Sequence, residues 1–234
     1  RDERVTRLVA RETQCRAAEY RQIDFPARSG RPRENFGAVD FAANSQVHAY
    51  PPGTAHRRQF PDAARDRAAG FCVFNDCGIA AEYLRREFAV QRVAYVDIDA
   101  HHGDGVFYGF EEDPDLIFAD IHEDGRYLYP GTGHAHETGR GRARGTKLNI
   151  PLPPGAADDD FLSAWERVEG HVDAARPEFI LLQCGADGIA GDPLTHLAYT
   201  TASHRLATER LCRLADRHCG GRLLALPAKV RAGE

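Results

Sequence analysis

The feature that most constrains the fold of this chain is a group of charged side chains directly after an apolar run. Val93 to Val96 is short, β-branched and aromatic, so it predicts a buried strand. The segment that follows, from Asp97 to Asp104, carries five ionisable side chains within eight residues. Alternate side chains on a strand share a face, so Asp97, Asp99 and, if the extended geometry continues, His101 are expected to point the same way. Buried charges at a strand's carboxyl end need compensation, and a divalent cation is the simplest candidate.

Patterns typical of strands and helices alternate along the rest of the chain. The predicted strands are Val93–Ile98, Leu116–Ile121, Glu178–Cys184 and Arg222–Leu226. Helical periods cover Gly78–Phe88, the segment after Asp158–Asp160 through Val168, and Ser203–His218. This alternation predicts an α/β fold with a single parallel sheet flanked by helices on both faces.

The expected organisation is one domain preceded by a segment that is hard to interpret. Within residues 1–60, Arg1–Tyr20 has mixed charges and a weak helical period, and Arg21–Asn44 is rich in Arg, Gly and Pro with little apolar content. Residues 61–234 hold the α/β pattern. The stretch from His122 to Gly145 is an unusually long connection and therefore a candidate functional loop.

Composition limits the partners and the location. The net charge of −5 gives no reason to expect nucleic acid or an anionic membrane as a partner, and the three arginines between Gly139 and Gly145 are expected to be solvated. No apolar run reaches the length of a membrane span, and no signal-peptide pattern opens the chain. The six cysteines show no C-x-x-C pair, which favours reduced thiols and a cytoplasmic protein. The chain opens on Arg1 and contains no Met, so an upstream targeting segment stays open.

A three-ligand metal site can be assembled from two strand ends. Asp99-x-His101 supplies two ligands, and Asp187 is the best third because Leu181–Cys184 is predicted to deliver it to the carboxyl end of another strand. Three protein ligands leave a position for a water molecule, whose pKa the metal lowers towards neutrality. Zn²⁺ is the expected ion, and an Asp₂His set would also accept Fe²⁺ or Mn²⁺. The alternatives are a capped loop with solvated carboxylates and, for Asp187 alone, a turn or helix N-cap.

Five ordered segments resemble the zinc-dependent histone deacetylase superfamily, which includes acetylpolyamine amidohydrolases and acetoin-utilisation proteins. They are Gly70–Asp76, Asp97–Val106, Tyr129–Gly133, Leu148–Leu152 and Gly185–Pro193. The resemblance runs from Gly70 to Leu226, about two thirds of the chain. It implies the arginase–deacetylase fold and hydrolysis of an N-acyl amide.

Roles follow from the resemblance position by position. It implies that Asp99, His101 and Asp187 are the zinc ligands and that Asp97 and Asp104 orient and charge the active-site histidines. It also implies that Gly70, Phe71 and Tyr129 belong to a narrow channel that grips an alkyl stem, although composition alone favours core positions for the two aromatic residues.

The sequence departs from the family in two places. The family has two adjacent histidines after a Pro-Gly segment, whereas Pro51–Arg58 contains only His56, which could occupy either position and serve as the general base. The family also has a tyrosine in a Gly-rich loop after a strand like Leu223–Leu226, and residues 227–234 contain none. Loss of a general base costs about 10²–10⁴ in rate, and loss of an oxyanion donor about 10²–10³. A domain that is incomplete at both ends is therefore expected.

Three functions compete at this point. The first is a metal-dependent amidohydrolase that removes acetyl or acyl groups from an amine, with acetyl-lysine in a protein or a small acetylpolyamine as substrate. The second is a catalytically impaired relative that binds metal and an acyl-amine ligand without efficient turnover. The third is a two-manganese ureohydrolase of the arginase type, which needs further carboxylates near Asp187, where the sequence offers only Asp192. The sequence leaves the oligomeric state open.

Overall fold

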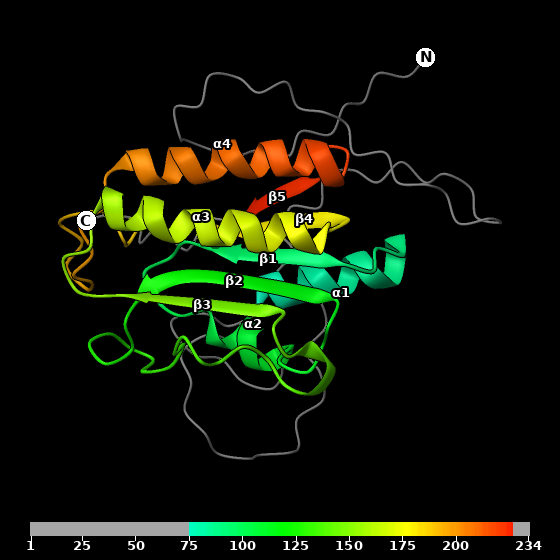
Figure 1. The fold of residues 1–234 in the computed structure, drawn as a ribbon, viewed down its shortest axis with the longest axis horizontal. Coiled ribbons are helices and arrows are strands. Elements are labelled where there is room, and N and C mark those ends of the chain that lie inside the picture. The colour runs from blue at the N-terminus through cyan, green and yellow to red at the C-terminus, as the bar shows by residue number, and fades with distance from the viewer. Residues whose placement is uncertain (1–74, 227–234) are drawn as a thin grey trace. The chain divides into compact units, whose positions relative to one another are not determined.

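Five parallel strands form a single sheet in the computed structural model, which describes residues 75–226 (Figure 1). The strands are β1 (Val93–Asp97), β2 (Leu116–Glu123), β3 (Lys147–Leu152), β4 (Phe179–Gln183) and β5 (Leu223–Leu226). Their spatial order is β3-β2-β1-β4-β5, and all four neighbouring pairs are parallel. The predicted α/β fold with one parallel sheet is confirmed.

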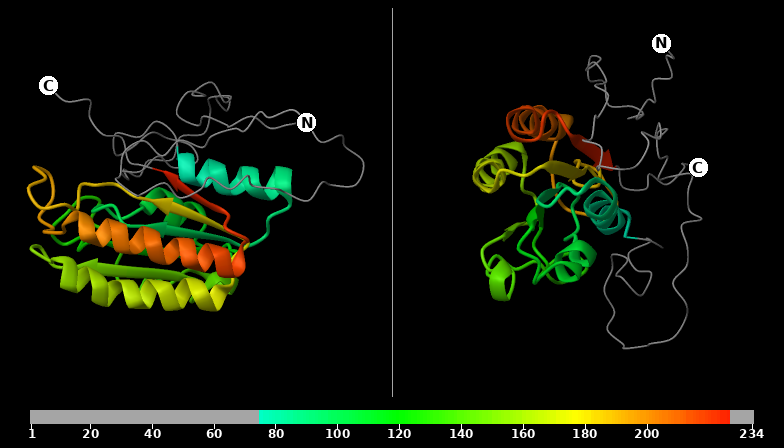
Figure 2. Two further views of the ribbon diagram at one scale, coloured as in Figure 1. Left: turned by 90° about the horizontal axis from the view of Figure 1, so that it is seen from above. Right: turned by 90° about the vertical axis from the view of Figure 1, so that its right-hand side faces the viewer.

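Helices cover both faces of this sheet. They are α1 (Asp76–Phe88), α2 (Asp104–Gly109), α3 (Asp158–Ala175) and α4 (Thr201–His218). The right-hand view of Figure 2 shows α3 and α4 on one face and α1 and α2 on the other. The chain first proceeds from β1 to β3 and then returns in the opposite direction from β3 through β4 to β5. Right-handed crossovers therefore place α2 on one face and α3 and α4 on the other.

Burial on both faces explains the composition of the central strands. All five residues of β1 and all eight of β2 are buried, which suits the continuous apolar runs of a parallel sheet. On α3, Phe161, Trp165 and Val168 recur at helical spacing and are each at most 1% exposed, so this face of the helix packs on the core.

The strand order reverses between β1 and β4, which lie side by side although distant in sequence. Val96 pairs with Leu182 and Asp97 with Gln183, so both strands end at the same level. The chain leaves β1 towards β2 and leaves β4 towards β5, which opens the crevice where parallel sheets bind ligands. The arrowheads of β2 and β5 in Figure 1 mark this carboxyl edge.

Three details differ from the sequence prediction. β1 ends at Asp97, one residue before the predicted end at Ile98, and Asp99 and His101 lie in a bend, so the extended geometry does not continue to His101. β2 continues to Glu123, which places His122 in the strand. Neither α2 nor β3 is predicted from the sequence, since α2 is a six-residue helix and β3 contains a proline that suits its place beside only one described strand.

Buried Lys147 stabilises the amino end of the sheet. Lys147 is 2% exposed. Its ammonium group donates hydrogen bonds to the backbone carbonyls of Asp113 (2.8 Å) and Leu116 and to Thr146 Oγ1 (3.1 Å). Burial lowers the pKa of Lys147 to about 8. These bonds tie the start of β3 to the start of β2.

The division between residues 1–60 and 61–234 stays a prediction, because its boundary lies outside the described residues. Within residues 75–226 no helix is both long and apolar enough to cross a membrane.

Asp158 joins the amino ends of α3 and α4. Its carboxylate accepts hydrogen bonds from Thr200 N–H (2.9 Å), from the Thr200 hydroxyl (2.6 Å) and from the Ser203 hydroxyl. Burial would raise the pKa of Asp158, but the hydrogen bonds from Ser203 and Thr200 outweigh it and hold the pKa below its usual value.

We expect Asp158→Asn to lower the free energy of unfolding at pH 7 by about 1.5 kcal/mol, because charge-assisted bonds are weakened. A depressed carboxyl pKa stabilises the fold above the unfolded pKa, so the difference from wild type should shrink as the pH falls below about 4. Urea denaturation between pH 7 and pH 3 measures both effects. Asp159→Asn, an exposed position in the same turn, is the matched control. Equal stability losses in the two variants would contradict this role.

Candidate metal centre

Three potential metal ligands meet at the carboxyl ends of β1 and β4. Asp99 and His101 follow β1, Asp187 follows β4, and one ligand atom from each lies within 4.8 Å of the others. His101 Nδ1 lies 2.8 Å from Asp187 Oδ2 and 3.2 Å from Asp99 Oδ1. Within residues 75–226 this is the only such group of His, Cys, Asp or Glu side chains.

The backbone after β1 bends so that its own N–H groups hold the carboxylates. Asp99 Oδ1 accepts a hydrogen bond from His101 N–H, and Asp187 Oδ1 accepts one from Ala100 N–H, each at 2.8 Å. Glycine at position 185 leaves room for the Asp99 carboxylate, because a Cβ there would overlap that carboxylate and lie 2.7 Å from its Cγ. The close passage of the β4 loop past Asp99 therefore depends on this glycine.

The electrostatics of the group suit a cation. Burial raises the pKa of Asp99 to about 6. Burial by itself would lower the pKa of His101, but the hydrogen bonds and charges of Asp187 and Asp99 outweigh it and raise this pKa to about 10. In Asp187, the hydrogen bonds from His101 and Ala100 outweigh burial and keep the pKa below its usual value.

The donor set fits a catalytic zinc ion. Two carboxylates and one imidazole provide three protein ligands, the number typical of sites that keep a position for water. His101 Nδ1, which faces both carboxylates, is the nitrogen placed to exchange its proton for a metal. The same set would accept Fe²⁺ or Mn²⁺.

Asp97 and Asp104, expected to support the active-site histidines, lie outside this group. Asp97 is 2% exposed and accepts hydrogen bonds from the Tyr95 hydroxyl and from Asp99 N–H (3.0 Å). Its burial, followed by the charges of Asp120 and Asp99, raises its pKa well above the usual value. Asp104 is fully buried in the first turn of α2. The expected roles of both carboxylates stay predictions.

A buried pair next to Asp97 has no counterpart among the sequence-predicted site residues. Asp120 lies opposite Asp97 on β2 and accepts bonds from Gly103 N–H and from His122 Nδ1, both 2.8 Å long. His122 Nε2–H donates to the Gly133 carbonyl at 2.9 Å. Burial would lower the pKa of His122, but the charge of Asp120 outweighs it and raises this pKa. The alternation of Asp120 and His122 with Ala119 and Ile121 is the signal for a continued strand.

The loop that carries Tyr129 is anchored on two buried histidines. His102 Nδ1 is hydrogen-bonded to Thr132 Oγ1 at 2.8 Å, and burial lowers the pKa of His102 to about 4. Gly133 has a φ of +84°, and a Cβ there would overlap His122 Nε2 and lie 2.7 Å from the His102 ring. Tyr129 itself is 58% exposed. Its place in a channel wall stays a prediction, and His56, Gly70 and Phe71 lie outside the described residues.

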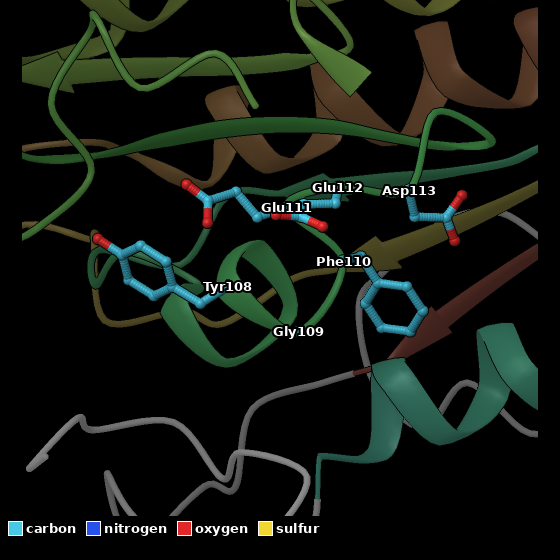
Figure 3. Close-up of a pocket in the computed structure, with 6 residues that line it drawn as sticks. All are labelled: Tyr108, Gly109, Phe110, Glu111, Glu112 and Asp113. Atoms are coloured by element: carbon cyan, nitrogen blue, oxygen red, sulfur yellow. The ribbon is translucent and has the colours of Figure 1, made fainter. Parts of the chain in front are cut away.

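Two further features do not add ligands. Asp192, the carboxylate considered for a second manganese, accepts a hydrogen bond from Leu194 N–H (2.8 Å) and is not in the metal group. A separate hollow at the carboxyl end of α2 is lined by Tyr108–Asp113 (Figure 3). Three of its polar side chains are already engaged, with Tyr108 bonded to Glu137, Glu111 to Arg140 and Asp113 to Arg85.

Comparison with known families decides the assignment. The family model of the histone deacetylase domain matches residues 40–227. The chain belongs to the histone deacetylase family. The resemblance inferred from the five sequence segments is thereby confirmed.

Two relatives are similar in sequence to this deacetylase-family chain. It is 43% identical over 191 residues to the acetoin utilization protein AcuC of Bacillus subtilis, covering 81% of this chain and 48% of that protein. It is 40% identical over 154 residues to the chloroplastic histone deacetylase 14 of Arabidopsis thaliana, covering 65% of this chain and 36% of that protein. The chain thus spans half or less of the length of these relatives.

Solved structures give the same fold. The HDA15 HD domain matches with a TM-score of 0.66 and 31% identity, over 74% of this chain and 48% of that one. The histone deacetylase Clr3 matches with a TM-score of 0.62 and 31% identity, over 66% and 26%.

We expect Gly185→Ala to weaken zinc binding by about 10-fold or more, because the added methyl group must push the Asp99 carboxylate out of the group. Calorimetric titration with zinc measures the affinity. Gly170→Ala in α3, where a Cβ meets nothing within 4 Å, is the control and should bind zinc as wild type does. Unchanged affinity in Gly185→Ala would show that Asp99 is not a ligand.

Proposed function

We propose that this chain carries the metal centre of a zinc-dependent amidohydrolase that removes acetyl or other acyl groups from an amine. The observation that carries the proposal is the group of Asp99, His101 and Asp187 at the strand-order reversal of a deacetylase-family sheet. Acetyl-lysine in a protein and a small acetylpolyamine are the proposed substrates. A cytoplasmic location, with neither nucleic acid nor membrane as partner, belongs to the same proposal.

Asp99, His101 Nδ1 and Asp187 would hold the zinc ion. When bound, zinc polarises the acyl carbonyl and lowers the pKa of its water ligand. The contribution of the chain is to fix the three ligands: the Ala100 and His101 N–H groups orient the carboxylates, and Gly185 lets the two strand-end segments approach.

The proton of the water has to be taken by a histidine that can reach the substrate. His102 and His122 are each at most 1% exposed. His102 Nδ1 faces Thr132, and the two ring nitrogens of His122 face Asp120 and the Gly133 carbonyl. Neither ring is accessible to a substrate, so both serve to anchor the Tyr129 loop. We therefore keep His56 as the proposed general base, with Asp97 and Asp104 as its supporting carboxylates.

Tyr129 is the described residue proposed to contact the substrate. Its ring is more than half exposed, while the loop that carries it is fixed through Thr132 and Gly133. An exposed ring on a fixed loop can pack along the alkyl stem of a lysine or polyamine. Phe71 is the proposed opposite wall, with Gly70 beside it.

The direct test is acetate release from an acetyl-lysine peptide and from an acetylpolyamine by the zinc-loaded protein. We expect measurable turnover by the wild-type protein. Loss of a hydrogen-bond partner of a metal ligand typically lowers activity 10- to 100-fold, so we expect Asp187→Asn, which changes a ligand itself, to reduce turnover by about 100-fold or more. Asp192→Asn changes a carboxylate in the same loop that is not in the metal group, and it should retain the wild-type rate.

Two outcomes would change the proposal. Equal turnover in Asp187→Asn and wild type would contradict the assigned metal centre. A wild-type protein that binds zinc and the acyl amine without releasing acetate would instead favour the second function, a relative that binds without efficient turnover.

A further inference from the structure

We propose that Glu123 is a positioning residue that holds the two halves of the metal centre together. This inference rests on the proposed function and concerns a carboxylate outside the ligand group. Glu123 is the last residue of β2, and none of its side-chain surface is exposed. A fully buried carboxylate is costly unless both oxygens are satisfied, so its partners indicate what it does.

Both oxygens of Glu123 are taken by a single residue. His196 N–H donates to Oε2 at 2.7 Å, and His196 Nδ1–H donates to Oε1 at 2.9 Å. The His196 side chain is 63% exposed, whereas the Glu123 carboxylate beneath it is fully buried. Two bonds to one residue fix both the position and the orientation of the backbone there.

His196 belongs to the loop that carries Asp187. The hydroxyl of Thr195, the residue before His196, donates to the backbone carbonyl of Asp187. The His196 carbonyl accepts a hydrogen bond from Gly155 N–H at 2.7 Å. The segment that follows β3 therefore also holds the backbone of His196. The Glu123 carboxylate therefore reaches Asp187 through His196 and Thr195.

The backbone of Glu123 holds the other half of the centre. Glu123 N–H donates to the Ala100 carbonyl at 2.9 Å. Ala100 lies between the ligands Asp99 and His101, and its own N–H donates to Asp187 Oδ1 at 2.8 Å. One residue at the end of β2 thus fixes the Asp99–His101 segment through its main chain and the Asp187 loop through its side chain.

Because Glu123 acts through the ligands, its loss should change metal affinity and coordination geometry without removing the site. Outer partners of metal ligands typically contribute 10- to 100-fold to affinity. Glu123→Gln keeps the side-chain volume but removes the negative charge that assists both bonds to His196, so both bonds are weakened. We expect about 10-fold weaker metal binding in this variant.

The experiment is a titration with Co²⁺, whose visible absorption reports coordination geometry, together with chelator competition for Zn²⁺ affinity. Glu123→Gln should show weaker binding and an altered Co²⁺ spectrum. Lys147→Met is the matched control, since it removes another buried charge at the opposite end of the sheet. This variant should be destabilised yet bind metal with wild-type affinity and spectrum.

A pair of variants at His196 separates positioning from general loss of structure. His196→Ala removes the Nδ1 donor and should weaken metal binding. In His196→Asn the side-chain amide can donate from nearly the same place, so it should restore affinity towards the wild-type value.

The inference is overturned if Glu123→Gln keeps the wild-type affinity and spectrum, or if Lys147→Met loses affinity as strongly. Either result leaves the proposed function standing, because wild type still binds the metal. A wild-type protein that binds neither Co²⁺ nor Zn²⁺ overturns the proposed function and this inference with it.

Discussion

The pairing of β1 with β4 is the interaction on which the metal centre depends. The two strands are parallel and end at the same level, with Asp97 opposite Gln183. Ile98 N–H continues the pairing by donating to the Gln183 carbonyl at 3.0 Å, and the chain then bends. Without this register, His101 and Asp187, which are 86 residues apart in sequence, would not come within 2.8 Å of each other. The crevice at the strand-order reversal is thus a consequence of the sheet topology. The side chains of Asp99, His101 and Asp187 give this crevice its potential metal ligands.

The sheet accommodates several buried charged groups because each is held by specific partners. At the carboxyl end, Asp120 is paired with His122, and Glu123 with His196. At the amino end, the Lys147 ammonium is held by two carbonyls and a hydroxyl. Removing one partner of such a group leaves an unpaired charge in a medium of low polarity, which is strongly destabilising. The buried charges therefore restrict how the strand-end segments can be arranged. At the carboxyl end of the sheet, these segments carry the proposed metal ligands.

The fold and the ligand group could be predicted because they rest on local patterns. The apolar runs of β1, β2, β4 and β5 are continuous, and Asp99, His101 and Asp187 each lie a few residues after such a run. The deacetylase resemblance connected those separate patterns.

Other parts of the site depend on partners that no local pattern reveals. The bend after Asp97 is held by side chains that accept from the backbone, which a strand pattern does not show. The link between Glu123 and His196 joins residues 73 positions apart. Helix α2 has only six residues, two of them glycine, so its sequence resembles a loop, and its formation depends on packing against the rest of the domain.

The proposed metal centre requires Asp99, His101 and Asp187 to hold one zinc ion together. Diffraction from crystals of the zinc-loaded protein, measured on both sides of the zinc absorption edge, would locate that ion. We expect one anomalous peak bonded to a carboxylate oxygen of each aspartate and to His101 Nδ1, at about 2.0–2.2 Å. Zinc bound at other residues, or no peak between the ends of β1 and β4, would contradict the proposed metal centre.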